Sequence, residues 1–152
     1  MSKLVQLVVL GEPLGKERPR YTNCGGFIRT YTPQKTINYE SLIAHEYNEK
    51  YGTLMFGKDE PVHATITAYY GLNRADFGKK GINKSGREKI ANLYCPVKSD
   101  IDNIVKSILD ALNSICFYDD KQVVSINASK CYTLKSPRVE ILLEGLNEKF
   151  EK

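Results

Sequence analysis

The sequence has few of the residues that build metal–thiolate centres or disulfide frameworks. It contains four cysteines in 152 residues, and these are widely spaced, with no C-x-x-C pair. A zinc site usually includes at least one closely spaced pair of ligands, and disulfide frameworks are typical of smaller, secreted chains. We therefore expect the four cysteines to be buried or half-buried free thiols. The two histidines, His45 and His63, are also far apart, and neither carries a catalytic pattern by itself.

Long apolar segments are lacking as well. No run approaches the roughly 18 apolar residues of a membrane-spanning helix, and the segment MSKLVQLVVLGEPLG lacks the apolar length and the cleavage site of a signal peptide. We therefore expect a cytoplasmic protein with no membrane partner. At 41% hydrophobic and 26% charged residues, the composition is typical of a folded soluble chain rather than a disordered one. With no internal repeat or domain boundary, residues 1–152 are expected to form a single domain.

Two segments have the periodicity and the end signals of helices. The first, residues 32–52, begins with Thr32 as a cap and Pro33 at the first helical position, and it stops at Gly52. Its apolar residues recur at helical spacing, so most of this stripe is expected to face the core. The second, residues 100–115, has a broad apolar arc opposite an arc of Asp, Asn and Lys side chains.

The remaining periodic segments predict strands. Residues 3–10 form an apolar run that ends at Gly11, and residues 61–71 alternate apolar and polar side chains as a half-buried strand does. The runs QVVSINASKCY and RVEILLE flank the turn sequence TLKSP, which predicts a hairpin. The order strand, helix, strand, helix, strand, strand indicates an α/β (α+β) fold, a small mixed sheet covered by two main helices.

Two long connections, residues 11–31 and 71–99, are rich in basic side chains. The whole chain has a net charge of +4 and a pI of about 8.8, values that permit nucleic-acid binding without requiring it. Residues 71–99 alone contain seven basic and two acidic residues, an excess larger than the charge of the whole chain. Either segment by itself can be a solvated polar loop, although loops this long are usually functional or mobile. Two basic loops in one chain with an acidic motif, the second of them leading directly into that motif, favour nucleic-acid binding instead.

The acidic motif lies in KSDIDNIVKSILDALN, residues 98–113. Hard divalent cations such as Mg²⁺ bind carboxylate oxygens, offset phosphate charge and activate water, as phosphodiester hydrolysis requires. In D-x-D at the start of a helix, the two side chains project to the same side while the backbone is still extended. Asp100 and Asp102 fit this geometry. Lys106, one turn after Asp102, is suited to pair with it, contact phosphate or assist the leaving group.

The same residues also fit a structural interpretation. Ser99 with Asp102 three residues later is a capping signature, and each acid in the first turn is stabilised by the helix dipole by roughly 0.3–1 kcal/mol. Asp102, Lys106 and Asp110, spaced by four, can form a surface ladder of ion pairs. Spacing alone leaves the two interpretations open. An EF-hand is excluded, because a loop counted from Asp100 has Val at its sixth position and Ala at its twelfth.

Taken together, KSDIDNIVKSILDALN and the following FYDDKQVV closely resemble the signature of the RusA family of Holliday junction resolvases. In that family a D-x-D-N-x-x-K-x-x-x-D-x-L helix entry is followed by an aspartate pair and a Gln-Val strand start. Upstream, GKERPRYT and YTPQKTINYE are similar to the family's Gly-Lys-x-Arg-Pro-Arg segment and its Tyr-Thr-Pro helix start. The resemblance runs in matching order from about Gly11 to Glu144. The Lys-rich insertion around residues 75–92 departs from the family pattern.

The resemblance implies a homodimeric, Mg²⁺- or Mn²⁺-dependent endonuclease that cuts four-way DNA junctions by paired nicks in recombination and repair, of a kind often encoded by phages and prophages. By position, Asp100 and Asp102 match the metal-binding aspartates, and Asp120 matches the third acid. Lys106 matches the catalytic lysine. The basic residues expected to contact branched DNA are Lys16, Arg18, Arg20, Arg29, Lys79, Lys80, Lys84 and Lys98.

Chain geometry adds a constraint on Asp120. A helix over residues 101–115 is about 21 Å long, and the five residues that follow span at most ~17 Å, so Asp120 cannot easily return to Asp102 in the same chain. Either the helix ends early and the loop runs straight back, or the metal site lies nearer the helix middle, or a partner subunit supplies Asp120. We favour the third arrangement, a dimer in which acids from both chains approach one another. Asp119 is a weaker candidate for the third acid, and Asp110 can have a structural role.

Two other functions fit the same observations. A phage accessory protein that binds DNA without cutting it would keep the basic loops, but it would have no need of the acids and the lysine of the motif. A metal-dependent nuclease can also act on other branched DNA. Nicking of a synthetic four-way junction, beside linear duplex and with or without Mg²⁺, distinguishes the three functions.

Overall fold

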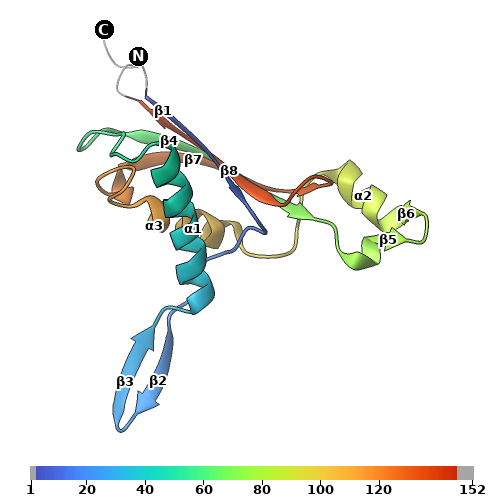
Figure 1. Cartoon of the computed structure of the whole chain (residues 1–152), viewed down its shortest axis with the longest axis horizontal. Coiled ribbons are helices and arrows are strands. Elements are labelled where there is room, and N and C mark those ends of the chain that lie inside the picture. Colours follow the sequence, from blue (N-terminus) through green and yellow to red (C-terminus); the bar gives the residue numbers. More distant parts are fainter. Residues whose placement is uncertain (1–2, 147–152) are drawn as a thin grey trace.

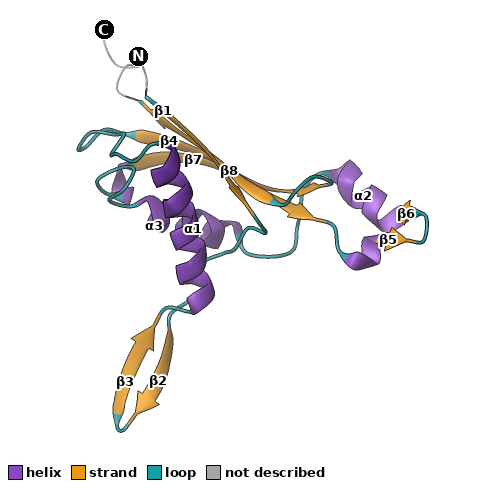
Figure 2. Ribbon diagram, in the orientation of Figure 1, coloured by secondary structure: helices purple, strands orange, loops and turns teal. Residues whose placement is uncertain are grey.

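A four-stranded mixed β-sheet covered on one face by two helices forms the body of the protein (Figures 1 and 2). The computed structural model describes residues 3–146. In the order in which they lie in the sheet, the strands are β1 (Leu4–Leu10), β8 (Arg138–Gly145), β4 (Val62–Gly71) and β7 (Val123–Thr133). β8 is antiparallel to both of its neighbours, whereas β4 and β7 are parallel. The helices over the sheet are α1 (Gln34–Lys50) and α3 (Ile101–Leu112).

The core lies between these helices and the covered face of the sheet. Buried residues alternate with more exposed ones in β1, β4 and β8, because successive side chains of a strand point to opposite faces. α3 buries Ile104, Ile108 and Leu112 in this core, and α1 buries Ile43 and Tyr47. The α+β class and both predicted helices are confirmed, although α3 ends three residues earlier than expected. Within residues 3–146, no helix combines the length and the apolar character needed to cross a membrane.

The predicted hairpin of β7 and β8 is wrong, because β4 lies between these two strands. Residues 134–137 join them across the end of β4, where a Cβ atom on Gly71 would lie only 3.2 Å from Cγ of Pro137. The sequence of a short polar connection does not show whether the two strands pair with each other as a hairpin or lie on either side of a third strand. As a result, β7 is an edge strand of the sheet.

The connection 11–31 contains a separate hairpin that projects away from the sheet (Figure 1). It pairs β2 (Arg20–Cys24) with β3 (Phe27–Tyr31), and all ten strand residues are exposed. Gly25 and Gly26 form the turn with φ values of 59° and 90°, which a two-residue hairpin turn favours and glycine adopts without strain. Cys24, expected to be at least half-buried, is exposed because nothing covers this hairpin, whereas the other three cysteines are buried. We call residues 20–31 the hairpin arm.

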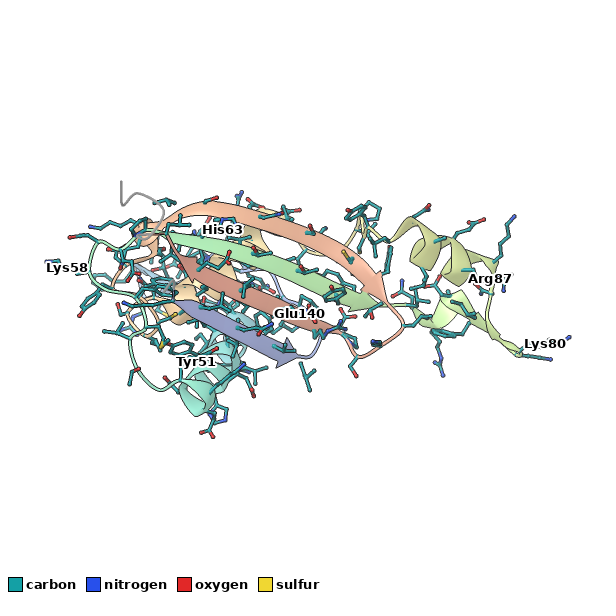
Figure 3. All side chains as sticks on the ribbon, turned by 90° about the horizontal axis from the view of Figure 1, so that it is seen from above. Tyr51, Lys58, His63, Lys80, Arg87 and Glu140 are labelled. Atoms are coloured by element: carbon teal, nitrogen blue, oxygen red, sulfur yellow. The ribbon has the colours of Figure 1, made fainter. Side chains whose placement is uncertain are left out.

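Residues 71–99, expected to be a basic loop, contain a second folded unit. It lies beyond the end of the sheet where β4 and β7 finish, with Lys80 and Arg87 far from the sheet (Figure 3). We call residues 73–92 the basic arm. Its elements are η1 (Arg74–Asp76), β5 (Phe77–Gly78), β6 (Gly81–Ile82) and α2 (Lys84–Asn92).

One buried carboxylate, that of Asp76, holds the basic arm together. It is 1% exposed and accepts hydrogen bonds from the Lys89 ammonium (2.9 Å), the Ser85 hydroxyl (2.9 Å) and the backbone N–H of Asn73 (2.8 Å). The hydrogen bond from Lys89 is the main cause that lowers the pKa of Asp76. The Lys89 ammonium also lies 5.7 Å from the ring centroid of Tyr132 on β7, a cation–π contact that joins the arm to the sheet. Polar contacts rather than an apolar core therefore organise this arm.

Replacing Asp76 with Asn should open the basic arm without unfolding the sheet. The amide keeps the size of the carboxylate but leaves the Lys89 ammonium without its countercharge, a loss that should speed local opening by roughly ten-fold or more. Hydrogen–deuterium exchange should therefore be faster in residues 84–92 and unchanged in β4. Because folding lowers the pKa of Asp76, the wild-type arm should lose the same stabilisation as the pH falls below about 4, the ordinary aspartate value.

Glu88→Gln is the matched control for this experiment. Glu88 lies on the same helix, but it is exposed and its contact with Lys84 is long, 3.9 Å. Exposed pairs of this kind contribute little to stability, so the control should exchange at the wild-type rate. Equal exchange in D76N and the wild type would mean that the arm does not depend on this carboxylate.

Candidate active site

Asp100 and Asp102 lie at the start of α3, and both side chains are exposed. Asp100 occupies the capping position with an extended backbone (φ −63°, ψ 140°), but its side chain makes no capping hydrogen bond. Ser99 does not cap the helix either, because its hydroxyl accepts a hydrogen bond from the backbone N–H of Gly15 (3.2 Å). The capping interpretation is therefore wrong, although the helix dipole still favours acids at this end.

The alternative of an ion-pair ladder along α3 is also wrong. Among the ion pairs of residues 3–146, none includes Asp102 or Lys106. Asp110 pairs with Lys16, from the segment before β2, rather than with Lys106 on its own helix. Asp102 and Lys106 are exposed and one turn apart, so they share one solvent-facing side of α3.

A hollow of about 510 Å³ lies beside Asp100, between the start of α3 and residues 15–20. Besides Lys16, three cationic side chains that the sequence predicted as DNA contacts line it, namely Arg18, Arg20 and Lys98. The hollow thus brings positive side chains from two distant segments next to one of the predicted metal-binding acids.

Close backbone contacts hold Gly15 and Lys16 against α3. The backbone N–H of Lys16 donates to the carbonyl of Asn103 (2.9 Å), beside the hydrogen bond from Gly15 to Ser99. A Cβ atom on Gly15 would lie 2.9 Å from Cβ of Ser99 and 3.1 Å from Cβ of Asn103. Only glycine allows this approach, which gives the Gly-Lys pair of GKERPR a structural reason.

Lys16, another predicted DNA contact, is engaged inside the protein. Its ammonium pairs with Asp110 on α3 and with Glu40 on α1, 3.2 Å from Oε1, and the three side chains are about three-quarters buried. Burial opposes the charge of Lys16, but hydrogen bonds to Asp110 and Glu40 outweigh burial and raise the pKa of Lys16. These ion pairs tie the segment before β2 to both helices. They also give Asp110 a structural partner and balance the charge of Lys16 in the free protein.

Asp119 and Asp120 lie at the opposite end of α3. The backbone N–H of Asp120 donates to the side-chain oxygen of Asn113 (3.1 Å), the residue that follows the helix. Asp119 accepts a hydrogen bond from the backbone N–H of Lys121 (3.0 Å), which lowers the pKa of Asp119. Burial, followed by the neighbouring carboxylates of Asp119 and Asp110, raises the pKa of Asp120. These three acids therefore form a second group that is close enough to interact.

The length of α3 separates the two acidic groups. Asp102 lies in the first turn of α3, and Asp120 is bonded to Asn113, which follows the last turn. From Asp102 to Asn113 the chain advances about 16 Å along the helix axis, at ~1.5 Å per residue. Accordingly, within residues 3–146 no three His, Cys, Asp or Glu side chains are grouped so that they can hold a metal ion. The loop after α3 does not run back to Asp102, which removes the first of the three arrangements considered for Asp120.

The edge strand β7 runs beside α3 and connects the two acidic groups. It begins directly after residues 120–122, and its residues 128–130 line a hollow together with Asp100 and Asp102. Large apolar side chains remain exposed near this path. We call them the apolar strip; each is at least 40% exposed, and the members are Ile101, Tyr118, Val124 and Ile126.

Lys130 on β7 contributes to the site although no motif singled it out. Its ammonium donates to the carbonyls of Val97 (2.8 Å) and Ser99 (2.9 Å), which positions the segment that leads into α3. The position of Lys130 in the alternating pattern of β7 is the sequence feature that could have identified it. Lys130 occupies the same face as Ala128 and Tyr132, where an apolar residue is expected.

The other predicted DNA contacts lie on the two arms. Arg29 is on the hairpin arm. The exposed predicted contacts of the basic arm are Lys79, Lys80 and Lys84. The predicted cations therefore extend from the hollow beside Asp100 to two projecting units rather than forming one patch (Figures 1 and 3).

Comparison with known proteins identifies the family of the chain. A family model described as Endodeoxyribonuclease RusA matches residues 11–144. The chain is also 30% identical over 146 residues to a Bacillus subtilis (strain 168) protein named Uncharacterized protein YqaN, and the alignment covers 94% of this chain and 97% of that protein. The matched residues include the hollow, all of α3 and both acidic groups. The chain therefore belongs to the RusA endodeoxyribonuclease family.

Proposed function

We propose that the protein is a Holliday junction resolvase, which cuts four-way DNA junctions by paired nicks and depends on Mg²⁺ or Mn²⁺. One observation carries the proposal. Asp100 and Asp102 are exposed carboxylates with no ion pair among the described residues. Asp100 nevertheless lines the hollow that contains Arg18, Arg20 and Lys98, and Asp102 follows it two residues later at the start of α3. A DNA backbone attracted by these cations brings a phosphate toward the carboxylates. That approach is repulsive unless a cation lies between the two groups.

The donor atoms at the start of α3 suit a hard divalent cation. Mg²⁺ is usually bound by one or two carboxylates, together with water and substrate phosphate. Asp100 and Asp102 offer such oxygens, and neither is engaged in a helix cap. A bound cation would offset the phosphate charge and lower the pKa of a water molecule. Lys106, exposed one turn further along α3, is suited to stabilise the negative charge that develops on the phosphate.

A second copy of the chain would complete the set of acids. In a two-fold dimer with the α3 helices side by side and antiparallel, the start of one helix meets the end of the other. Asp102 then lies near Asp120 of the partner subunit, although the two residues are far apart within one chain. The apolar strip supports this arrangement, because exposed large apolar side chains beside α3 are typical of a subunit contact.

The basic arm extends the DNA-binding surface beyond the hollow. Its lysines Lys79, Lys80 and Lys84 are exposed, whereas Asp76 is buried against Lys89 and does not offset their charge. In a dimer the arm is present twice, which suits the two-fold symmetry of a four-way junction. Phosphate contacts of this kind give affinity that is independent of sequence and falls steeply with salt concentration.

Asp102→Asn should abolish junction cleavage and leave junction binding intact or tighter. The substitution removes a cation ligand, which should slow cleavage by roughly a hundred-fold or more, and it removes a negative charge that faces phosphate. Cleavage is measured on a synthetic four-way junction beside linear duplex, with and without Mg²⁺, and binding is measured without divalent cation. The wild type should give Mg²⁺-dependent, symmetric nicks on the junction alone.

Glu49→Gln is a suitable control for D102N. It also neutralises one exposed carboxylate, but Glu49 lies in the last turn of α1, next to Lys50, which donates to β1 at the other edge of the sheet. Cleavage by D102N at the wild-type rate would refute the metal assignment. Junction binding by the wild type without cleavage would identify a DNA-binding accessory protein. Cutting of flaps in preference to four-way junctions would identify a nuclease for other branched DNA.

Mixed dimers test whether Asp120 acts from the partner subunit. D102N and D120N should each be inactive alone, but in a mixed dimer one of the two shared sites receives both substitutions and the other receives none. Mixing the two inactive variants should therefore restore single nicks in the junction, at roughly a quarter of the wild-type rate if subunits exchange at random. If both acids act within one chain, every site carries one substitution and no activity returns.

A further inference from the structure

The two faces of the hairpin arm differ in chemistry. In an antiparallel pair, directly opposed residues point to the same side, and the side alternates along each strand. One face therefore carries Arg20, Thr22, Cys24, Phe27, Arg29 and Tyr31. The other face carries Tyr21, Asn23, Ile28 and Thr30, which are uncharged. We call the first of these the cationic–aromatic face.

The cationic–aromatic face lacks any covering element in the described part of the chain. Phe27 is 77% exposed and Tyr31 is 47% exposed, although both are large and apolar enough to favour burial. A two-stranded hairpin is only marginally stable by itself, so exposed aromatic side chains on it need a reason other than folding. The segment from Arg20 to Tyr31 also contains no acidic residue. Both features indicate a partner that offers apolar surface and negative charge together.

We propose that the cationic–aromatic face binds DNA bases that are unstacked at the branch point of the junction, with Phe27 and Tyr31 against the bases and Arg20 and Arg29 on the flanking phosphates. This inference rests on the proposed function and deepens it. Aromatic side chains bind nucleic acid by stacking on base faces, which are hidden inside a regular duplex and become available where strands separate. Arginine supplies the charge that the phosphates require.

A second copy of the chain fits this face less well than DNA does. In a two-fold contact the same patch meets itself, so Arg20 and Arg29 would meet the same two arginines of the partner. No acid on either hairpin arm offsets Arg29, and among the described residues Arg20 is offset only by Glu17 at the base of the arm (3.2 Å). Such a contact brings like charges together, which is unfavourable.

The position of the hairpin arm agrees with this role. Arg20 belongs to β2 and also lines the hollow beside Asp100, so the base of the arm adjoins the proposed cutting site. The four steps of β2 from Arg20 to Cys24 advance about 14 Å at ~3.4 Å per residue, or roughly four base-pair rises. One DNA strand can therefore contact the hollow and the tip of the arm at the same time.

The native Cys24 provides a direct test of this contact. It lies opposite Phe27 on the cationic–aromatic face and is exposed, whereas Cys95, Cys116 and Cys131 are buried. A junction carrying one base with a tethered mixed disulfide is incubated with the full-length protein, without divalent cation. The Cys24 thiolate attacks the tether sulfur, forms a protein–DNA disulfide and releases the small thiol. Cross-linking should be at least about ten-fold faster with the tether at the branch point than one helical turn into an arm.

Cys24→Ser should abolish this cross-link, which assigns it to the hairpin arm. Equal cross-linking at the branch point and within the duplex arm would overturn the proposal. So would a cross-link that persists in C24S, because another thiol would then be the one that meets the DNA.

Adjacent residues on opposite faces of β3 give a matched pair of variants. Phe27→Ala should weaken junction binding about ten-fold, the effect of losing one stacked base, and should change the affinity for linear duplex less than two-fold. Ile28→Ala should change neither affinity, because Ile28 is equally exposed (74%) but lies on the other face. Phe27→Tyr should retain junction binding, since a tyrosine ring also stacks. Equal losses on junction and duplex in F27A, or a loss in I28A as large as in F27A, would overturn the proposal.

Two further measurements separate this inference from the proposed function. If the wild type binds junctions in a Phe27-dependent way but does not cut them with Mg²⁺, the resolvase assignment fails and the role of the hairpin arm stands. If the wild type cuts junctions and F27A keeps the full preference for junction over duplex, the role of the hairpin arm fails. A change of oligomeric state in F27A, measured by sedimentation, would assign the face to a subunit contact and overturn the proposal.

Discussion

The rigidity of α3 sets the arrangement of every acidic residue in the site. Ile104, Ile108 and Leu112 are fully buried against the sheet, so the helix cannot shift or unwind at either end without exposing the core. An α-helix advances by a constant amount per residue, and α3 therefore separates Asp102 from Asn113, to which Asp120 is bonded, by about 16 Å along the helix axis. No rotation of side chains closes such a gap. A site that combines Asp100 and Asp102 with Asp120 would consequently require Asp120 from a second chain.

Charged residues in the protein divide into two groups according to whether they have partners. Lys16 is paired with Asp110 and Glu40, and Lys89 is paired with Asp76; these partly buried ion pairs hold segments together and leave little net charge. Asp100, Asp102 and Lys106 make no such pairs among the described residues and remain in solvent. Apart from the small stabilisation of acids by the helix dipole, unpaired exposed charge contributes little to folding. Its concentration at the start of α3, beside a cationic hollow, is therefore better explained by a ligand that brings both a phosphate and a cation.

The sequence predicts the elements that depend on residues close together in the chain, and it fails where residues far apart in the chain make the contacts. The periodicity of residues 100–112 predicts α3 because its apolar face is continuous along the chain, and alternation predicts β4 for the same reason. The basic arm was missed because Asp76 folds it through polar contacts with residues 9 and 13 positions away, which leave no apolar pattern. The pairing of β7 with β4 was missed because it is parallel and non-local. Ser99 has the sequence position of a helix cap, but its hydroxyl accepts a hydrogen bond from Gly15, 84 residues away, which no local pattern predicts.

A site shared between chains would also link cutting to substrate symmetry. In the proposed arrangement neither subunit has a complete set of acids, so an isolated chain that meets ordinary duplex has no competent site. Two complete sites exist only in the dimer, where they are related by a two-fold axis and separated by a distance that the α3 helices fix. A four-way junction presents two equivalent phosphates in a similar relation. The same helix length that keeps the acids apart within one chain would thus restrict cleavage to paired positions on branched DNA.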